Sequence, residues 1–224
     1  MAKVKRKKLR VGRFLIFLLL VAGVLFLTSK FLDNRIKNIV VNGNDVLSEK
    51  EIVEISGLSN YPSFFKTTTF TIKKRLMKNP IIKKVKVRKR FYNKIEIDIV
   101  EKKLLYLDEQ ENRVVLEDKT KIANNNSYSV PILVNYIPNT KYNQFIKKLN
   151  KIHVDVLKKV SEITYSPTEL DDGRFLLSMT DSNYVYLTLT KFEHLNYYDD
   201  MLPKFNGRKG ILYLDSGNTF KIME

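Results

Sequence analysis

Residues 83–103 read KKVKVRKRFYNKIEIDIVEKK, and this stretch decides the fold of the first half of the chain. Apolar residues alternate with charged ones in both of its halves: Val85 and Val87, then Ile95, Ile97 and Ile99. A period of two residues is typical of a β-strand with one buried and one polar face. Tyr92 and Asn93 lie between the two runs, so the stretch predicts a β-hairpin that turns at this pair.

The outer face of this hairpin carries charges of both signs. Lys86, Arg88 and Arg90 fall on one strand, and Glu96 and Asp98 fall on the other. Opposite charges on neighbouring strands can pair across the ladder, so we expect ion pairs between these two groups.

A longer run, from Lys73 to Lys94, holds eleven Lys or Arg residues and no acid. Such a run is most often a set of solvated faces on helices and strands. The other interpretation is a basic surface that faces anionic lipid headgroups or an acidic partner. The candidate residues for that surface are Lys83, Lys84, Lys86, Arg88 and Arg90.

Upstream of the hairpin the sequence predicts one strand and two helices. Apolar residues at 36–41 form a short strand that ends in an Asn-Gly-Asn turn. Ser48 and Glu51 have the spacing of a capping box, and Gly57 is placed to stop the helix that they start. A second helix begins near Thr69 and ends before Pro80. The predicted order is strand, helix, helix, strand, strand.

The segments IKNIVVNGNDVLSEKEIVEISGL (36–58) and FFKTTTFTIKKRLMKNPIIKKVKVRKRFYNKIEIDIVEKK (64–103) resemble the POTRA domain of the bacterial cell-division proteins FtsQ and DivIB. The layout of the chain, with a basic tail, an apolar segment, this domain and a β-rich region, is similar to that family as well. The family usually has a Pro-Asn pair in the hairpin turn, where this chain has Tyr92-Asn93.

The apolar segment before this domain has two possible interpretations. Phe14 to Leu27 is an unbroken apolar run of about 21 Å as a helix, which is the length of a cleaved signal peptide. Extension to Leu32 gives about 28 Å, close to the thickness of a bilayer core, and no small-residue cleavage site follows. We therefore expect a retained transmembrane helix over residues 14–32.

Charge on the two flanks predicts the orientation of that helix. Seven Lys or Arg residues precede it, within a tail over residues 1–13, and the positive-inside rule places that tail in the cytoplasm. The remaining chain then lies outside, as a POTRA domain over 33–103 and a second domain over 104–224. The net charge of +16 resides almost entirely in the front half, which favours membrane topology over nucleic-acid binding.

The second domain is predicted to be β-rich. We expect a hairpin over 105–116, a helix from Tyr142 to Val160, and strands at 174–179 and 184–189. Thr190 and Glu193 have capping-box spacing, which predicts a further helix, and two short strands end the sequence.

The resemblance implies that these last strands form an edge that accepts a strand from a partner. The matching candidate residues are Tyr213, Asp215, Ser216, Gly217 and Phe220. From the residues alone, Ser216-Gly217 is a plain hairpin turn, and both interpretations stay open.

Nothing in the sequence points to catalysis, a metal or a cofactor. Cysteine is absent, which excludes disulfides and thiolate metal sites, and no phosphate loop or hydrolase motif is present. His153 falls on an apolar helical face and is expected to pack in the core, whereas His194 is expected at the surface.

The sequence thus predicts an α+β protein with one membrane span, a POTRA domain and a second β-rich α+β domain. The resemblance implies a non-enzymatic divisome scaffold at the division septum. Its implied partners are small bitopic coiled-coil division proteins, FtsB/DivIC-like and FtsL-like. One alternative is a membrane-tethered POTRA-like module that binds acidic wall polymers or a secretion partner. An alternative of another class is an anchored hydrolase in residues 104–224.

Overall fold

The computed structural model describes residues 11–32, 34–125 and 128–223, and its contacts divide the chain into two compact units, one ending at Val100 and one beginning at Glu101. Helix α1 runs over Val11–Leu32. The basic tail predicted over 1–13 lies outside the described residues except for its last three positions. In the part of the chain that is described, no helix is long and apolar enough to cross a membrane.

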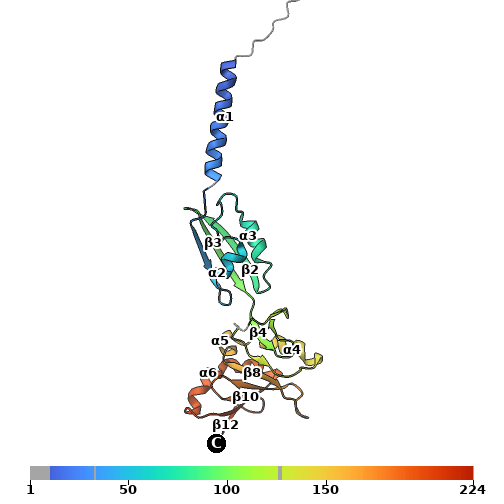
Figure 1. Ribbon diagram of the computed structural model, residues 1–224. Helices are drawn as coiled ribbons and strands as arrows, with labels where there is room; N and C mark the ends of the chain where they lie inside the picture. The colour runs from blue at the N-terminus through green and yellow to red at the C-terminus, as the bar shows by residue number, and fades with distance from the viewer. Residues whose placement is uncertain (1–10, 33, 126–127, 224) are drawn as a thin grey trace, which may run out of the picture. The chain divides into compact units, whose positions relative to one another are not determined.

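The first unit has the predicted order of elements after α1. Its strands and helices are β1 (Asn38–Asn42), α2 (Glu49–Ser56), α3 (Thr69–Leu76), β2 (Ile82–Arg90) and β3 (Lys94–Glu101). The three strands form a sheet in the order β1-β3-β2, and β1 runs parallel to β3 (Figure 1). Ile95, Ile97 and Ile99 on the central strand are buried, so this face of the sheet carries the core.

The caps of α2 are those that the sequence predicts. The Ser48 side chain accepts a hydrogen bond from the backbone N–H of Glu51, and the Glu51 carboxylate accepts one from the backbone N–H of Ser48 (2.8 Å). Gly57 ends the helix with a left-handed φ of 74°. A Cβ on Gly57 would lie 2.1 Å from Nη1 of Arg75, which donates to the carbonyl of Ser56. One residue of the basic run therefore serves as a helix cap.

The outer face of the β2–β3 hairpin is held by the predicted cross-strand ion pairs. Arg88 lies 2.5 Å from Asp98 and 3.3 Å from Glu96, and Arg90 lies 2.9 Å from Glu96. In the turn, Tyr92 and Asn93 both have left-handed φ values, 60° and 54°. Two consecutive residues of this kind are what a tight type I′ hairpin turn requires.

The second unit contains one large mixed sheet. Among the described residues its strands are β4 (Leu104–Asp108), β5 (Arg113–Leu116), β6 (Lys121–Ala123), β7 (Ile132–Leu133), β8 (Val160–Tyr165), β9 (Arg174–Met179), β10 (Tyr184–Thr188), β11 (Gly210–Tyr213) and β12 (Thr219–Ile222). They pair in the order β12-β11-β10-β9-β8-β7-β4-β5-β6. Figure 1 shows β8, β10 and β12 in succession toward the C-terminal end.

Helices cover the core face of this sheet. They are α4 (Asn139–Leu149), α5 (Val154–Leu157), the 3₁₀ segments η1 (Leu189–Tyr197) and η2 (Leu202–Phe205), and α6 (Tyr198–Met201). The centre of the core is aromatic: Phe145 stacks on Phe175 at 5.0 Å and meets Phe192 edge-on at 5.9 Å between ring centroids. All three side chains are fully buried.

The prediction of one long helix in this unit is wrong. Instead of running from Tyr142 to Val160, the chain forms α4, then α5, and enters β8 at Val160. The break puts His153 at the N-cap of α5 with an exposed side chain, so its predicted place in the core is wrong too. The apolar spacing continued across the break because Ile152, Val156 and Leu157 are buried on both sides of it.

The capping box predicted at Thr190 and Glu193 does not form. Residue Thr188 is the N-cap of the 3₁₀ segment η1, and it makes no side-chain capping bond. Glu193 instead pairs with Lys148 (3.0 Å) and Lys151 (2.9 Å) of the α4 region. His194 is exposed, as predicted.

Candidate functional site

The β11–β12 hairpin ends the described sheet on one side. Strand β11 pairs in parallel with β10 and antiparallel with β12, and β12 has no described strand on its other side. An edge strand offers a row of backbone N–H and C=O groups to any added strand. The sequence resemblance anticipated this edge.

The ladder shows which groups of β12 face outward. The N–H of Met223 donates to the carbonyl of Lys209 (3.0 Å), in the same register that pairs Lys221 with Ile211. Because hydrogen-bonded and non-hydrogen-bonded residues alternate along an antiparallel pair, Lys221 and Met223 face β11. The N–H and C=O of Phe220 and Ile222 therefore point to the open side.

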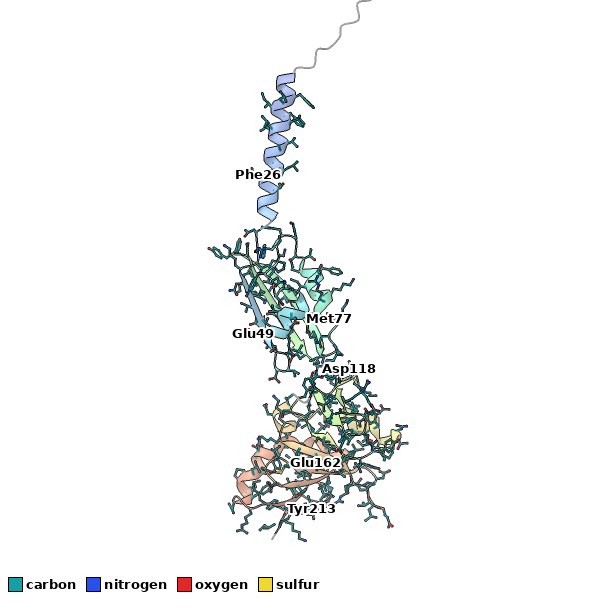
Figure 2. The ribbon with its side chains drawn as sticks, in the orientation of Figure 1. Phe26, Glu49, Met77, Asp118, Glu162 and Tyr213 are labelled. Carbon is teal, nitrogen blue, oxygen red and sulfur yellow. The ribbon has the colours of Figure 1, made fainter. Side chains whose placement is uncertain are left out.

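Tyr213 and Asp215 join the hairpin to the rest of the sheet. The ring of Tyr213, labelled in Figure 2, stacks on Tyr186 of β10 at 5.5 Å. Asp215 accepts from Nε of Arg174 at 2.7 Å, in an ion pair whose side chains are only 18% and 11% exposed. The guanidinium of Arg174 also lies 3.6 Å from the centroid of the Tyr186 ring. Both predicted residues thus have partners inside their own domain.

The other predicted residues divide between the turn and the interior. Ser216 and Gly217 lie exposed in the turn, where the Ser216 hydroxyl bonds with the Asp215 carboxylate (3.1 Å). Phe220 stacks on Phe205 with centroids 3.9 Å apart and an interplanar angle of 4°. The hairpin therefore directs its large aromatic side chain inward and leaves the strand backbone open outward.

A polar network that the sequence did not reveal holds the start of β11. Asn183, 2% exposed, accepts from the N–H of Gly210 (3.0 Å) and donates to the hydroxyl of Tyr198 (3.0 Å). That hydroxyl also contacts both carboxylate oxygens of Asp181. Burial, with the neighbouring carboxylate of Asp181, raises the pKa of Tyr198 and keeps its proton in place. The sequence showed only a turn at Asp181-Ser-Asn.

The opposite edge of the sheet is less open. Strand β6 has three residues, and Lys121 on it pairs with Glu111 (2.6 Å) and Asp108 (3.5 Å). Short length and a charged side chain are devices that keep an edge from pairing. Of the two edges, β12 is the better template for a partner strand.

The basic residues of the first unit are not brought together into one free surface. Arg88 and Arg90 are neutralised by Glu96 and Asp98. Lys83, Lys84 and Lys86 are exposed on β2.

The two histidines do line one surface hollow, with Thr190, Asn196 and Asp200 around them. The backbone N–H of His153 donates to the Asn196 side chain (2.7 Å). Across the described residues no group of His, Asp or Glu is arranged to hold a metal ion. No described contact makes either imidazole the partner of a nucleophile.

Comparison with known proteins finds a family model that matches the first unit and similar sequences over most of the chain. Residues 34–102 match the family model described as the POTRA domain, FtsQ-type. The cell division protein DivIB of Bacillus subtilis (strain 168) is 27% identical over 226 residues, covering 98% of this chain and 85% of that protein. The cell division protein DivIB of Bacillus cytotoxicus is 28% identical over 220 residues, covering 92% of this chain and 86% of that protein.

One solved structure is also similar. It is the major extracytoplasmic domain of the trans isomer of the bacterial cell division protein DivIB from Geobacillus stearothermophilus, 21% identical, covering 47% of this chain and 95% of that chain with a TM-score of 0.39. The sequence matches extend from the first unit through the second. They support a role in cell division: residues 34–102 match the FtsQ-type POTRA domain, and the chain as a whole is similar to cell division proteins named DivIB.

Proposed function

We propose that this chain is a non-enzymatic, membrane-anchored scaffold of the division machinery. Its POTRA domain (33–103) and β-rich domain (104–224) lie outside the membrane at the septum. There the chain binds small bitopic coiled-coil division proteins, FtsB/DivIC-like and FtsL-like, and helps to assemble or regulate septal wall synthesis. It turns over no substrate and needs no cofactor.

The anchor is residues 14–32, with the tail 1–13 in the cytoplasm. The observation in support is the surface of α1, where the apolar side chains from Phe14 to Leu27 are all exposed, Leu19 to 72%. Phe26 is one of the side chains that project from this helix (Figure 2). Apolar surface of that extent in water is unfavourable, and a bilayer would cover it.

The partner is bound by strand addition at β12. The single observation that carries this proposal is the open outer edge of β12 at the end of a well-packed sheet. A partner segment that adds as the next strand gains backbone hydrogen bonds from Phe220 and Ile222. Tyr213 and Asp215 hold the hairpin, Ser216 and Gly217 form its turn, and Phe220 packs it on the core.

Substitution Ile222→Pro tests strand addition directly. Proline removes an N–H that points away from β11, so the intramolecular ladder keeps its bonds while the partner loses one. We expect at least about tenfold weaker capture of the coiled-coil partner, since the ring also obstructs an approaching strand. Capture is measured by co-purification of the full chain from membranes.

Ile222→Ala is the matched control, because it shortens the same side chain and keeps the N–H. It should retain capture. Lys221→Pro removes an N–H that faces β11, so it should lower the stability of the hairpin as well. If Ile222→Pro binds the partner as tightly as Ile222→Ala, in proteins with equal thermal stability, strand addition at β12 is wrong.

A further inference from the structure

The turn of the β2–β3 hairpin exposes two large aromatic side chains. Phe91 and Tyr92 are each 91% exposed, although aromatic rings of this size are normally largely buried. Tyr92 also holds a left-handed φ of 60°, a conformation that a bulky side chain adopts only at a cost in free energy. Both rings therefore gain almost no packing within the domain in return.

Hydrogen bonds place this turn next to the start of the POTRA domain. The side-chain amide of Asn93 donates to Oδ1 of Asn34 (2.6 Å) and to the carbonyl of Arg35 (2.8 Å). The N–H of Phe64 donates to the carbonyl of Asn34 (2.8 Å). Three segments therefore meet at one end of the domain, and we call residues 34–37, 61–67 and 89–94 the N-terminal rim.

The N-terminal rim is basic as well as aromatic. It contains six Lys or Arg residues and no acid: Arg35, Lys37, Lys66, Lys89, Arg90 and Lys94. Arg90 and Lys94 pair with Glu96 just outside the rim, whereas Arg35 and Lys37 are exposed at the start of the domain. Lys89 lies 4.7 Å from the ring centroid of Phe64 and donates to its carbonyl, which orders the loop against the hairpin. Exposed rings among cations match the interface of an anionic bilayer, where aromatic side chains sit at headgroup level.

Chain length limits how far the rim can lie from α1. A single residue separates Leu32, the last residue of α1, from Asn34, so their Cα atoms are at most about 7 Å apart. The headgroup region extends about 5–7 Å beyond the hydrocarbon core on each side. If α1 is the anchor, the rim lies within or directly on the headgroups.

We propose that the N-terminal rim docks on the outer leaflet, with Phe91 and Tyr92 inserted at the interface and the exposed Arg35 and Lys37 against anionic headgroups. This inference rests on the proposed membrane anchor. Docking fixes the POTRA domain by two points, the end of α1 and the hairpin turn, instead of one. Lipid is favoured over a protein partner because the short connection keeps this surface at the bilayer.

The chain has no tryptophan, so single Trp substitutions give clean reporters of depth. Three full-length variants are reconstituted in vesicles: Phe91→Trp on the rim, Phe26→Trp in α1, and Tyr197→Trp, which replaces a ring 60% exposed in the second domain. Quenching of tryptophan fluorescence by lipids brominated on their acyl chains is measured in neutral phosphatidylcholine and with added phosphatidylglycerol.

We expect quenching for Phe91→Trp and Phe26→Trp but not for Tyr197→Trp. Anionic lipid should increase the docked-to-undocked ratio about fivefold for each basic side chain that reaches the headgroups. Adding Tyr92→Ser to Phe91→Trp should reduce the quenching toward the Tyr197→Trp level.

Each contrary result has its own meaning. Quenching of Phe26→Trp without quenching of Phe91→Trp overturns docking and leaves the anchor intact. Absence of quenching in Phe26→Trp overturns the anchor, and docking with it. Equal quenching of Tyr197→Trp shows that contact is not specific to the rim. If the tryptophan introduced by Phe91→Trp becomes shielded from solvent only when a division partner is added, the rim binds a protein, and lipid docking is overturned.

Discussion

The two hairpins β2–β3 and β11–β12 are built from similar alternating sequences but expose opposite parts. In the first, β3 lies inside its sheet, and the turn carries exposed aromatic rings at Phe91 and Tyr92. Its other strand, β2, is an edge that carries exposed lysines, which disfavour pairing with a further strand. In the second, the turn is small and polar, Phe220 packs on Phe205, and the outer strand β12 is open. The first hairpin exposes the side chains of its turn, and the second exposes the backbone of its outer strand.

This difference shows how the position of aromatic residues selects the mode of contact. A ring at a turn projects away from the sheet and can enter a soft interface such as headgroups. A ring on an edge strand that points into the core stabilises the strand while its backbone stays available. The two proposed contacts, of the first hairpin with the membrane and of the second with a protein, follow this difference.

The largest expected effect is a loss of stability in the second unit that leaves the hairpin of the first unit unchanged. Substitution Phe145→Ala removes a fully buried ring between Phe175 and Phe192, and we expect the second unit to lose about 3–5 kcal/mol of stability. Hydrogen exchange measured by mass spectrometry should show lost protection in β11 and β12. Peptides covering β2 and β3 should keep theirs, because they belong to the other unit. Equal loss in both hairpins would show that the units do not fold independently.

A smaller effect should act on the second hairpin alone. In Gly210→Ala the new Cβ would lie 2.2 Å from the carbonyl oxygen of Lys221 and 2.8 Å from Cζ of Phe220. Relief of this overlap moves β12 away from β11, and we expect the free energy of unfolding to fall by about 1–3 kcal/mol. Urea denaturation measures this change. Gly173→Ala is the control, since its Cβ would meet neighbours only at 3.4–3.5 Å. The steric account is wrong if the two variants unfold alike.

The smallest expected effect concerns the outer face of the first hairpin. Hydrogen bonds from Arg90 and Lys94 lower the pKa of Glu96. A carboxyl whose folded pKa is depressed contributes stability above its unfolded value of about 4.3, and that stability is lost as the pH falls through the folded pKa. Glu96→Gln should therefore be slightly less stable than the wild type at pH 7, and the two should converge under acid. Melting curves against pH measure this, and high salt should shrink the gap.

The first unit could be predicted nearly in full because its signals are local. The capping box at Ser48, the stop at Gly57 and the alternation in β2 and β3 each act within a few residues, and the structure contains all of them. The second unit was predicted less well where non-local contacts decide. Glu193 forms an ion pair with Lys148 of α4 in place of a helix cap. The buried Asn183 forms hydrogen bonds with Tyr198 and Gly210.

The candidate site shows the same division. The turn and the two final strands were readable from Asp215-Ser216-Gly217 and its apolar flanks, and both strands are present. The packing of Phe220 on Phe205 and the ion pair of Asp215 with Arg174 could not be predicted, because the partners lie at least fifteen residues apart in sequence. The exposure of Phe91 and Tyr92 was likewise invisible, since two aromatic residues in a charged run do not reveal what covers them.

The parallel pairing of β1 with β3 has a mechanical consequence. The chain enters the POTRA domain at the start of β1 and leaves it at the end of β3, and the two strands run in the same direction over five residue pairs. A force that pulls the start of β1 and the end of β3 apart therefore shears the two strands. It loads their hydrogen bonds together instead of opening them one at a time. Forced unfolding is governed by the unfolding rate, and in this geometry the β1–β3 bonds must break together for the domain to open. Force applied between the two ends of this domain would therefore be shared among the five residue pairs of β1 and β3.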